Sequence, residues 1–457
     1  MSGEHSAPDK RSYGRSASLL TLALGFAGVL TYAFFALASH SLDPDEYGNI
    51  VILWSVVFLL ASTLFRPIEQ LLARTLAERE QVGARSSDAL GAAVKIQVGT
   101  SLAAVAVLLI ARGPIERGLF DGEDALYWIM VASLVGFGLA YYARGFLAGR
   151  GQFRLYAALL VIEVSTRLAF AVVVALGIAG GANLVALGIA TAPIAPLIVL
   201  PLARRRRRAG RSAEPAPIPA DGGPQLTLGR GGAFAGAVLV MMLTEQVLIN
   251  SGALFVRAAE GPAAAGFIFN VLMVARAPLV LFQAIAASLL PHLTRLRARD
   301  DEGSRDAFRS SVEMTLLLVA GFGALTTVGV LAIGPEVMQL AFGDEFDYDR
   351  AGLAIVAVGM GFYLSAASLN QAALAQGQAT RAAGCWVLSA LTFVAFVLLA
   401  PLDVFRAVEV GFAGSAALLA ALLGAIYLWP HPSNAETLAP GSSRELEAQL
   451  LSADEIA

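Results

Sequence analysis

The sequence is poor in the residues that most catalytic and redox motifs require. It has one cysteine, Cys385, in 457 residues, which excludes an intrachain disulfide and every motif built on paired cysteines. Its two lysines, Lys10 and Lys95, do not follow a glycine, so a phosphate-binding loop of the GxxxxGK[ST] type is absent. The four histidines do not have the HExxH spacing of zinc hydrolases. The sequence therefore excludes an ATP site of the P-loop type and a zinc site of the HExxH type on this chain.

Charge is also scarce. Charged residues make up 15% of the chain, whereas soluble domains carry ~25%. In their place, 57% of the residues are hydrophobic, and the mean hydropathy is +0.69. Because a bilayer-spanning helix needs roughly 20 apolar residues, the composition predicts a polytopic membrane protein.

The apolar residues are grouped into stretches long enough to cross a bilayer. No irregular backbone can face lipid, so each stretch is predicted to be a helix, and the fold class is all-α with 12 transmembrane helices. The predicted helices cover residues 16–39, 49–71, 89–111, 125–146, 155–178, 182–202, 231–256, 263–290, 309–333, 351–375, 381–401 and 407–429. The first stretch has flanks typical of a signal peptide, but its length and the eleven stretches that follow favour an uncleaved helix.

The basic residues predict the orientation. With the N-terminus inside, cytoplasmic segments hold 23 of the 32 lysines and arginines, exterior loops hold five, and four lie within spans. Cytoplasmic loops of membrane proteins carry such an excess. We therefore expect a multi-pass protein of the cytoplasmic membrane with both termini in the cytoplasm.

One long polar break divides the helices into two sets of six. Residues 203–230 contain five consecutive arginines, then prolines and a glycine pair, which is typical of a disordered linker. We interpret the arginine run as a contact with anionic lipid and not with nucleic acid. The predicted organisation is a cytoplasmic tail (1–15), an N-lobe (16–202), a cytoplasmic linker (203–230), a C-lobe (231–429) and a second cytoplasmic tail (430–457).

The two lobes have similar short motifs in the same order. DPDEYGNI at 43–50 matches GPAAAGFI at 261–268, and QLLARTLAER at 70–79 matches SLLPHLTRLR at 288–297, both at an offset of 218. Gly-Pro at 113–114 recurs at 334–335, and the Leu-Ala and Gly-Gln pairs of 147–152 recur near 374–378. Six helices per lobe is an even number, so the lobes are predicted to be parallel repeats. Some transporters have this architecture and rock two bundles about a central cavity.

Residues 15–78, with the DPDEYGN turn, and the motif RGFLAGRGQFRLY at 144–156 resemble bacterial polysaccharide-export flippases. These belong to the multidrug/oligosaccharidyl-lipid/polysaccharide (MOP) exporter superfamily, and the likeness covers most of residues 15–430. The resemblance implies a MATE/MOP-flippase-like fold with a V-shaped cavity between the lobes. Drug–cation antiporters of this superfamily commonly carry an acid in the first helix, whereas the first helix here has none.

By the same resemblance, the protein is a flippase without a cofactor. It would move an undecaprenyl-diphosphate-linked oligosaccharide from the inner to the outer leaflet by alternating access, for cell-surface polysaccharide biosynthesis. An H+ or Na+ gradient is a candidate energy source. Expected partners are membrane lipid, the lipid-linked glycan, and a polysaccharide polymerase or glycosyltransferases.

Charged side chains within the spans are the first candidates for function, because each costs about 2.5–3.5 kcal/mol near the bilayer centre. Arginine binds diphosphates through paired, charge-assisted hydrogen bonds, and amide and hydroxyl groups bind sugars. The candidate cavity residues are Arg66, Arg167, Arg276, Glu163, Glu245, Asn250, Asn270 and Tyr141.

Structural roles remain open for each candidate. Arg167 lies four residues after Glu163, a spacing at which the two could neutralise each other. Arg66 could be an interfacial group near Glu69. Glu245 could take up the coupling proton or form a fixed ion pair. The polar residues could join neighbouring helices by hydrogen bonds.

Two other functions compete with the flippase. The same fold could serve an ion-coupled antiporter of drugs or small molecules. A membrane glycosyltransferase or polymerase would act on the same lipid but usually needs a large exterior loop, and the longest one predicted here covers residues 334–350. We therefore expect that the protein is not an enzyme.

Overall fold

The computed structural model describes residues 10–81, 87–198, 228–276, 293, 302–343 and 348–429. Within these residues the chain forms helices and no strand. The helices of the first half are α1 (Lys10–Ser41), α2 (Pro44–Gln81), α3 (Ser87–Ile110), α4 (Arg112–Leu119), α5 (Asp124–Gly149), α6 (Phe153–Ala175), α7 (Ala182–Thr191) and the 3-10 helix η1 (Ala195–Ile198). Those of the second half are α9 (Leu228–Glu260), α11 (Glu302–Phe342), α12 (Arg350–Ala375), α13 (Ala379–Leu399) and α14 (Val404–Leu428), together with an unlabelled helix, Pro262–Arg276.

The predicted membrane architecture is confirmed. Ten of the described helices are long and apolar enough to cross a membrane. Two shorter apolar helices, Ala182–Leu197 and Pro262–Arg276, lie where the sixth and eighth spans are predicted. Each of the twelve predicted stretches therefore contains a helix in the part of the chain that the structure describes.

The helix ends differ from the prediction in several places, and α2, for example, runs from Pro44 to Gln81 where residues 49–71 are predicted. Helix α1 already begins at Lys10, within the predicted tail, and α9 begins at Leu228, within the predicted linker. Helix α11 continues to Phe342 through a break at Ile333, where φ is −134° and ψ is 15°. The break directly precedes Gly334-Pro335. Proline explains it, because proline has no N–H and disfavours a helical conformation in the residues before it. Residues 203–227 and 430–457 lie outside the described residues.

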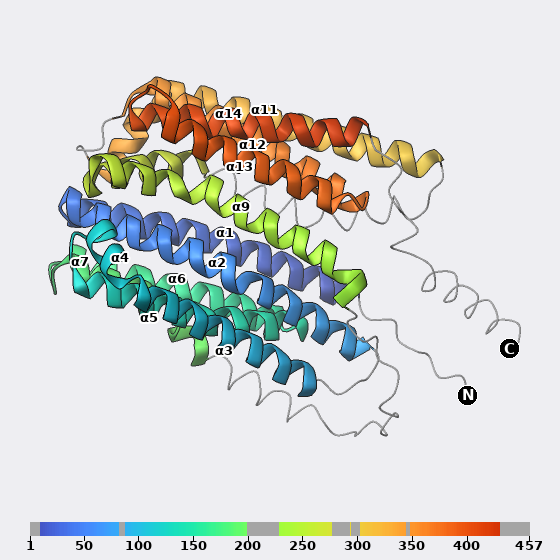
Figure 1. Cartoon of the computed structure of the whole chain (residues 1–457), viewed down its shortest axis with the longest axis horizontal. Helices are drawn as coiled ribbons and strands as arrows, with labels where there is room; N and C mark the ends of the chain where they lie inside the picture. The colour runs from blue at the N-terminus through green and yellow to red at the C-terminus, as the bar shows by residue number, and fades with distance from the viewer. Residues whose placement is uncertain are drawn as a thin grey trace, which may run out of the picture.

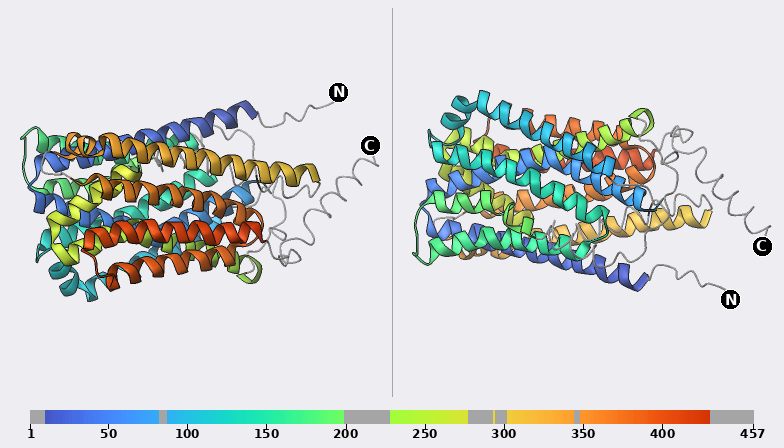
Figure 2. Two further views of the ribbon diagram at one scale, coloured as in Figure 1. Left: turned by 90° about the horizontal axis from the view of Figure 1, so that it is seen from above. Right: turned by 90° about the horizontal axis from the view of Figure 1, so that it is seen from below.

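The helices form two lobes that lie side by side (Figure 1). In the N-lobe α1 packs on α6 and α2 on α5; in the C-lobe α12 packs on α14 and α11. Helices α2 and α9 pack against each other and join the two lobes. The views in Figure 2 show that the helices of both lobes run roughly along one common direction.

The internal repeat is visible in the turns. Helices α5 and α6 are joined at Gly151, and α12 and α13 at Gly377, 226 residues later; both glycines have positive φ, 63° and 74°. In both turns the backbone N–H after the glycine donates to the carbonyl five residues earlier, at 2.9 Å (Gln152 to Leu147, Gln378 to Ala373). The left-handed conformation explains why glycine recurs at this position.

The first turns of the two lobes meet each other. The backbone N–H of Ala263 donates to the carboxylate of Asp45 at 3.3 Å, and these residues are related by the 218-residue offset. A Cβ added at Gly48 would lie 1.8 Å from the carbonyl oxygen of Pro262. Residues that correspond in a two-fold repeat meet at its axis, so this contact marks the axis between the lobes.

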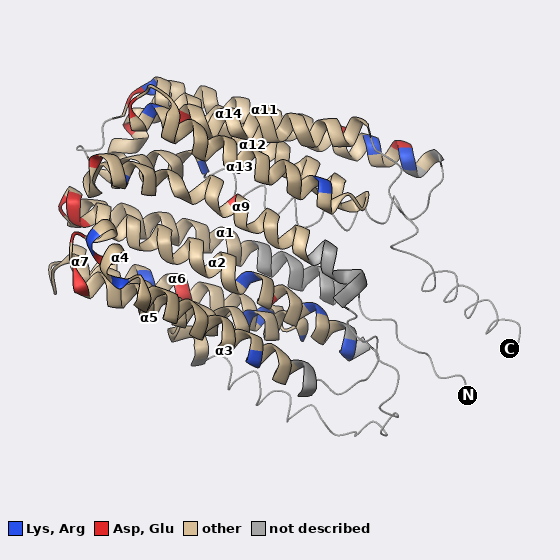
Figure 3. Ribbon diagram, viewed as in Figure 1, with Lys and Arg blue, Asp and Glu red and all other residues tan. Residues whose placement is uncertain are grey.

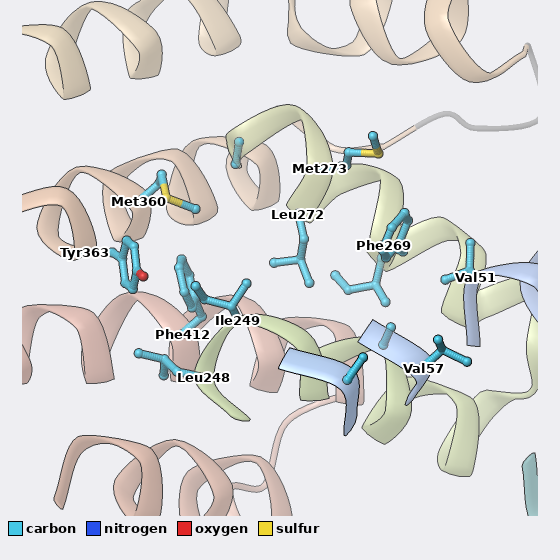
Figure 4. Close-up of a cluster of buried hydrophobic side chains, with 14 of the residues drawn as sticks. Val51, Val57, Leu248, Ile249, Phe269, Leu272, Met273, Met360, Tyr363 and Phe412 are labelled. Carbon is cyan, nitrogen blue, oxygen red and sulfur yellow. The ribbon is translucent and has the colours of Figure 1, made fainter. Parts of the chain in front are cut away.

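Apolar residues continue this contact into the interior. The rings of Phe35 on α1 and Phe269 have centroids 4.7 Å apart. Figure 4 shows Val51 and Val57 of α2 near Phe269 in the buried cluster that links the lobes. Next to it, Arg257 of α9 forms a salt bridge with Asp121 of the N-lobe at 2.7 Å.

The two ends of the bundle differ in charge. Acidic residues gather at the end where α1 meets α2, and basic residues gather towards the other end (Figure 3). The acidic end includes Asp43, Asp45, Glu46, Asp121, Glu123, Asp124, Glu260, Asp349 and Asp403. The contact between the first turns of the lobes lies at this acidic end.

Replacing Gly48 with alanine is expected to destabilise the contact between the lobes. The new methyl group would overlap the backbone at Pro262, and overpacking of this kind costs about 1–3 kcal/mol. Thermal unfolding of the purified protein in detergent measures the effect. Gly25→Ala is the control, because nothing lies within 4 Å of the added Cβ; equal stability of the two variants would contradict the close approach.

Candidate functional site

The N-lobe contains three charged side chains that are buried together. Glu163 of α6 accepts a hydrogen bond from Arg144 of α5, and its other oxygen lies 3.6 Å from the guanidinium of Arg167. The three residues are between 2% and 8% exposed. Glu163 and Arg167 are thus paired along the helix, as their spacing predicts, and Arg144 adds a second positive charge to the same carboxylate.

Arg167 is further stabilised by aromatic rings. Its guanidinium carbon lies 4.1 Å from the ring centroid of Trp54 on α2 and 5.9 Å from that of Phe34 on α1. A cation over an aromatic face gains about 2 kcal/mol or more when it is desolvated. Arg167 of α6 therefore contacts both α1 and α2 within the N-lobe.

A second polar group lies beside this triad. The hydroxyl of Tyr156 on α6 donates to Glu69 of α2 at 2.9 Å, and Glu69 is within electrostatic range of Arg144. Tyr141 lies under the guanidinium of Arg144, with 4.8 Å from carbon to ring centroid. Its hydroxyl is 3.3 Å from that of Ser62 on α2.

A third group lies in the C-lobe, at its boundary with the N-lobe. Tyr363 of α12 donates to Glu245 of α9 at 2.5 Å. Arg276 donates to the side-chain oxygen of Asn250 at 3.4 Å, and Asn250 donates to Gln246 at 2.9 Å. Tyr363 is within electrostatic range of both Glu245 and Arg276, so these residues form one cluster.

Arg66 of α2 connects the N-lobe groups to the C-lobe cluster. It is within electrostatic range of Glu69 in its own lobe and of Glu245 in the other. Its side chain is exposed, although protein surrounds it closely enough to remove much of its hydration. Among the described residues, Arg66 and Arg276 have no carboxylate in salt-bridge contact.

The charges of these groups do not cancel. In the described part of the chain they comprise four arginines (66, 144, 167 and 276) and three glutamates (69, 163 and 245). With every group ionised, one positive charge is left over. An uncompensated charge away from water is costly, and this set of seven side chains leaves one guanidinium without a carboxylate to balance it.

The corresponding positions of the C-lobe carry no charge. Helices α5 and α12, and the starts of α6 and α13, are related by an offset of 226 residues. At this offset Arg144 corresponds to Asn370, Glu163 to Ser389 and Arg167 to Phe393. Ser389 and Phe393 are buried at 0% and 1% exposure, so the same fold packs well with neutral residues at these places.

The eight predicted residues fall into three locations. Arg66, Glu245, Arg276 and Asn250 lie at the lobe boundary, and Arg167, Glu163 and Tyr141 lie inside the N-lobe. Asn270 is buried in the contact between the lobes, where it accepts a hydrogen bond from Tyr47. Four of the predicted residues therefore lie together at the lobe boundary. The other four are buried in the N-lobe or in the contact between the lobes.

Sequence reasoning missed several members of these groups. Arg144 lies near the end of its span and is counted with the cytoplasmic loop, whereas the structure buries it at 8% exposure. Arg144 is the first residue of the motif RGFLAG, and this position was the feature of the sequence that could have marked it as a candidate. Tyr363 and Tyr156 carry no charge, and only contacts between helices show that they bind Glu245 and Glu69.

Two cavities open at the acidic end, away from the candidate residues. One has a volume of about 500 Å³ and is lined by the rings of Phe267, Tyr348 and Phe405 and by charged side chains that include Arg406 and Glu409. The other has a volume of about 410 Å³ and lies beside the loop between α1 and α2. In the first, burial and the hydrogen bond to Glu409 raise the pKa of Tyr348, so its hydroxyl stays protonated at neutral pH.

Comparisons with solved structures identify the fold. An inward-facing multidrug resistance MATE family transporter of the MOP superfamily matches with a TM-score of 0.67 at 11% identity, over 90% of this chain and 99% of that one. A eukaryotic MATE transporter, AtDTX14, gives a TM-score of 0.63 at 13% identity, over 92% and 96%. The bent form of the Vibrio cholerae MATE transporter VcmN gives 0.59 at 15% identity, over 92% and 97%. The chain has the two-lobed fold of MATE transporters.

Comparisons with other sequences do not assign a more specific function to this chain. No protein-family model matches the chain. The uncharacterized protein Rv3630 of Mycobacterium tuberculosis is 27% identical over 360 residues, which cover 75% of this chain and 77% of that protein. The uncharacterized protein Mb3654 of Mycobacterium bovis has the same identity and coverage.

Replacing Glu163 with glutamine is expected to destabilise the N-lobe by about 3–5 kcal/mol. The change leaves Arg144 and Arg167 buried without their common carboxylate, and removal of one partner from a buried ion pair costs this much. Glu313→Gln is the matched control, because Glu313 and Arg309 form an exposed pair of a kind worth about 0–1 kcal/mol. Chemical or thermal unfolding in detergent measures both; equal losses would contradict the assigned role of Glu163.

Proposed function

We propose that the protein is a flippase that carries an undecaprenyl-diphosphate-linked oligosaccharide across the cytoplasmic membrane by alternating access. The fold supports a transporter, and the site supports an anionic cargo. The decisive observation is the pair of arginines at the lobe boundary, Arg66 and Arg276, neither of which has a carboxylate in salt-bridge contact among the described residues. A diphosphate would supply the negative charge that these two guanidinium groups lack.

The geometry suggests how one lipid could be held. The two arginines come from different lobes, so a diphosphate between them would contact both bundles at once. The polyprenyl tail would remain in contact with lipid, and the sugars would lie near polar groups such as Asn250 and Gln246. Rocking of the lobes would then change which side of the membrane the headgroup faces.

The orientation belongs to the same proposal. The basic end of the bundle would face the cytoplasm, in agreement with the distribution of arginines in the sequence. The lobe contact at the acidic end would then lie on the outer side. An antiporter of cationic drugs is the second candidate, because Glu245 provides a carboxylate at the lobe boundary.

Arg276→Ala is expected to reduce flipping about 10- to 100-fold, because a hydrogen bond to a charged group contributes about 1.5–3 kcal/mol. Arg276→Lys should also impair flipping, since lysine lacks the planar fork that binds two phosphate oxygens. The assay follows exposure of a fluorescent undecaprenyl-diphosphate saccharide in liposomes that contain the purified protein.

Arg309→Ala is the control for this assay, because Arg309 is an exposed arginine paired with Glu313 and distant from the cluster. A cationic dye is tested in parallel. Normal flipping by both Arg276 variants would remove Arg276 from the binding site. Movement of the dye without movement of the saccharide would favour the drug antiporter.

Glu245→Gln is expected to flatten the pH dependence of flipping if Glu245 carries the coupling proton, because glutamine does not titrate. Glu409→Gln is the matched control: Glu409 also accepts a hydrogen bond from a tyrosine, Tyr348, but lies at the acidic end. Flipping rates across a series of imposed pH gradients give the profile. An unchanged profile for Glu245→Gln would assign Glu245 a structural role as the partner of Tyr363.

A further inference from the structure

Arg66 has a nearby acidic residue on its own helix, yet the two do not pair. Glu69 follows Arg66 by three residues on α2, a spacing at which an arginine and a glutamate on a helix surface normally interact. The structure shows no salt bridge between them. Glu69 instead accepts a hydrogen bond from the hydroxyl of Tyr156 at 2.9 Å, and it also lies within electrostatic range of Arg144.

The backbone fixes Glu69 against the neighbouring helix. A Cβ added at Gly145 of α5 would lie 2.7 Å from the carbonyl oxygen of Glu69, and one added at Gly149 would lie 2.7 Å from that of Ala73. The two glycines therefore allow α2 and α5 to approach closely over one turn. Glu69 is held at the surface of α5, next to Arg144.

Arg144 is itself fixed in place. Glu163 accepts its hydrogen bond, and the ring of Tyr141 lies beneath its guanidinium. Both groups that hold Glu69 thus come from the motif RGFLAGRGQFRLY, whose first residue is Arg144 and whose last is Tyr156. The motif also provides the two glycines, so four of its residues act on the same stretch of α2.

We propose that Tyr156, together with Arg144, is a positioning residue that holds Glu69 away from Arg66 and so leaves the Arg66 guanidinium available to an anionic headgroup. This inference rests on the proposed function for the identity of the ligand, but the positioning itself can be tested without any ligand. When the hydroxyl of Tyr156 is removed, Glu69 loses its only hydrogen-bond donor among the described residues. Its carboxylate can then turn along α2 and pair with Arg66.

The test measures how readily Arg66 reacts with phenylglyoxal, an arginine-specific reagent, by mass spectrometry of the purified full-length protein in detergent. Tyr156→Phe is expected to slow modification of Arg66 about fivefold, which corresponds to an ion pair of about 1 kcal/mol. The double variant Tyr156→Phe/Glu69→Gln is expected to restore the wild-type rate, because the competing carboxylate is then absent.

Two references separate positioning from a general change of structure. Modification of Arg309 in the same samples gives an internal rate for an exposed arginine. Tyr127→Phe removes another buried tyrosine hydroxyl of the N-lobe, which donates to the carbonyl of Leu108 at 2.9 Å, and should leave the rate at Arg66 unchanged. An unchanged rate in Tyr156→Phe, or a slow rate that Glu69→Gln does not restore, would overturn the proposal.

Binding of undecaprenyl diphosphate in phosphatidylcholine vesicles, measured with the same variants, tests the ligand separately. Weaker binding in Tyr156→Phe and recovery in the double variant would extend the positioning role to the lipid. If the wild type does not bind this lipid while the modification rates follow the expected pattern, the proposed cargo fails and the positioning role stands.

Discussion

The burial of guanidinium groups between membrane-spanning helices is the constraint on which the site depends. A charge in this environment must be paired, stacked or left facing a recess. Arg144 and Arg167 share one carboxylate, and Arg167 also lies on Trp54. Arg66 and Arg276 have no such compensation among the described residues. Arg144 and Arg167 are thus compensated inside the N-lobe, whereas Arg66 and Arg276 lie where the two lobes meet.

The contact between the lobes has a different chemistry. It is built mainly from small residues, backbone atoms and apolar rings, with Gly48 against Pro262 and Phe35 against Phe269. Two tyrosine hydroxyls, of Tyr32 and Tyr47, also donate hydrogen bonds across it. Close approach at glycine allows backbones to touch, and helices in a membrane associate through the van der Waals packing that this allows. The salt bridge between Arg257 and Asp121 lies at the acidic end of this contact. Most of the buried ionic pairing in the described residues thus lies within the N-lobe, whereas packing and hydrogen bonds join the two lobes.

The fold was largely predictable from the sequence, and the site only partly. Long apolar stretches predict helices because lipid leaves no alternative, and the recurrent Gly-Gln turn at 151–152 and 377–378 marks the repeat. The ends were less predictable: proline at 335 breaks α11 without ending it, since the chain re-enters a helix beyond Ile333. Spacing along one helix predicted the pair Glu163–Arg167, but no spacing predicts contacts between helices. Arg144, Tyr156 and Tyr363 therefore could not be assigned to Glu163, Glu69 and Glu245 before the helices were placed.

The repeat itself argues that the buried charges serve more than folding. Because the two lobes share one fold, a comparison of matching positions shows which residues that fold requires. The N-lobe has Arg144, Glu163 and Arg167 at three of these positions. The C-lobe has Asn370, Ser389 and Phe393. Phe393 packs in the core at 1% exposure, so an apolar ring is sufficient there. Replacing buried ion pairs by apolar residues is often neutral or stabilising, so stability alone does not explain why Arg144, Glu163 and Arg167 are charged. Arg66 and Arg276 lie at the lobe boundary beside this triad, and the set of four arginines and three glutamates carries one excess positive charge, which is why we propose an anionic cargo.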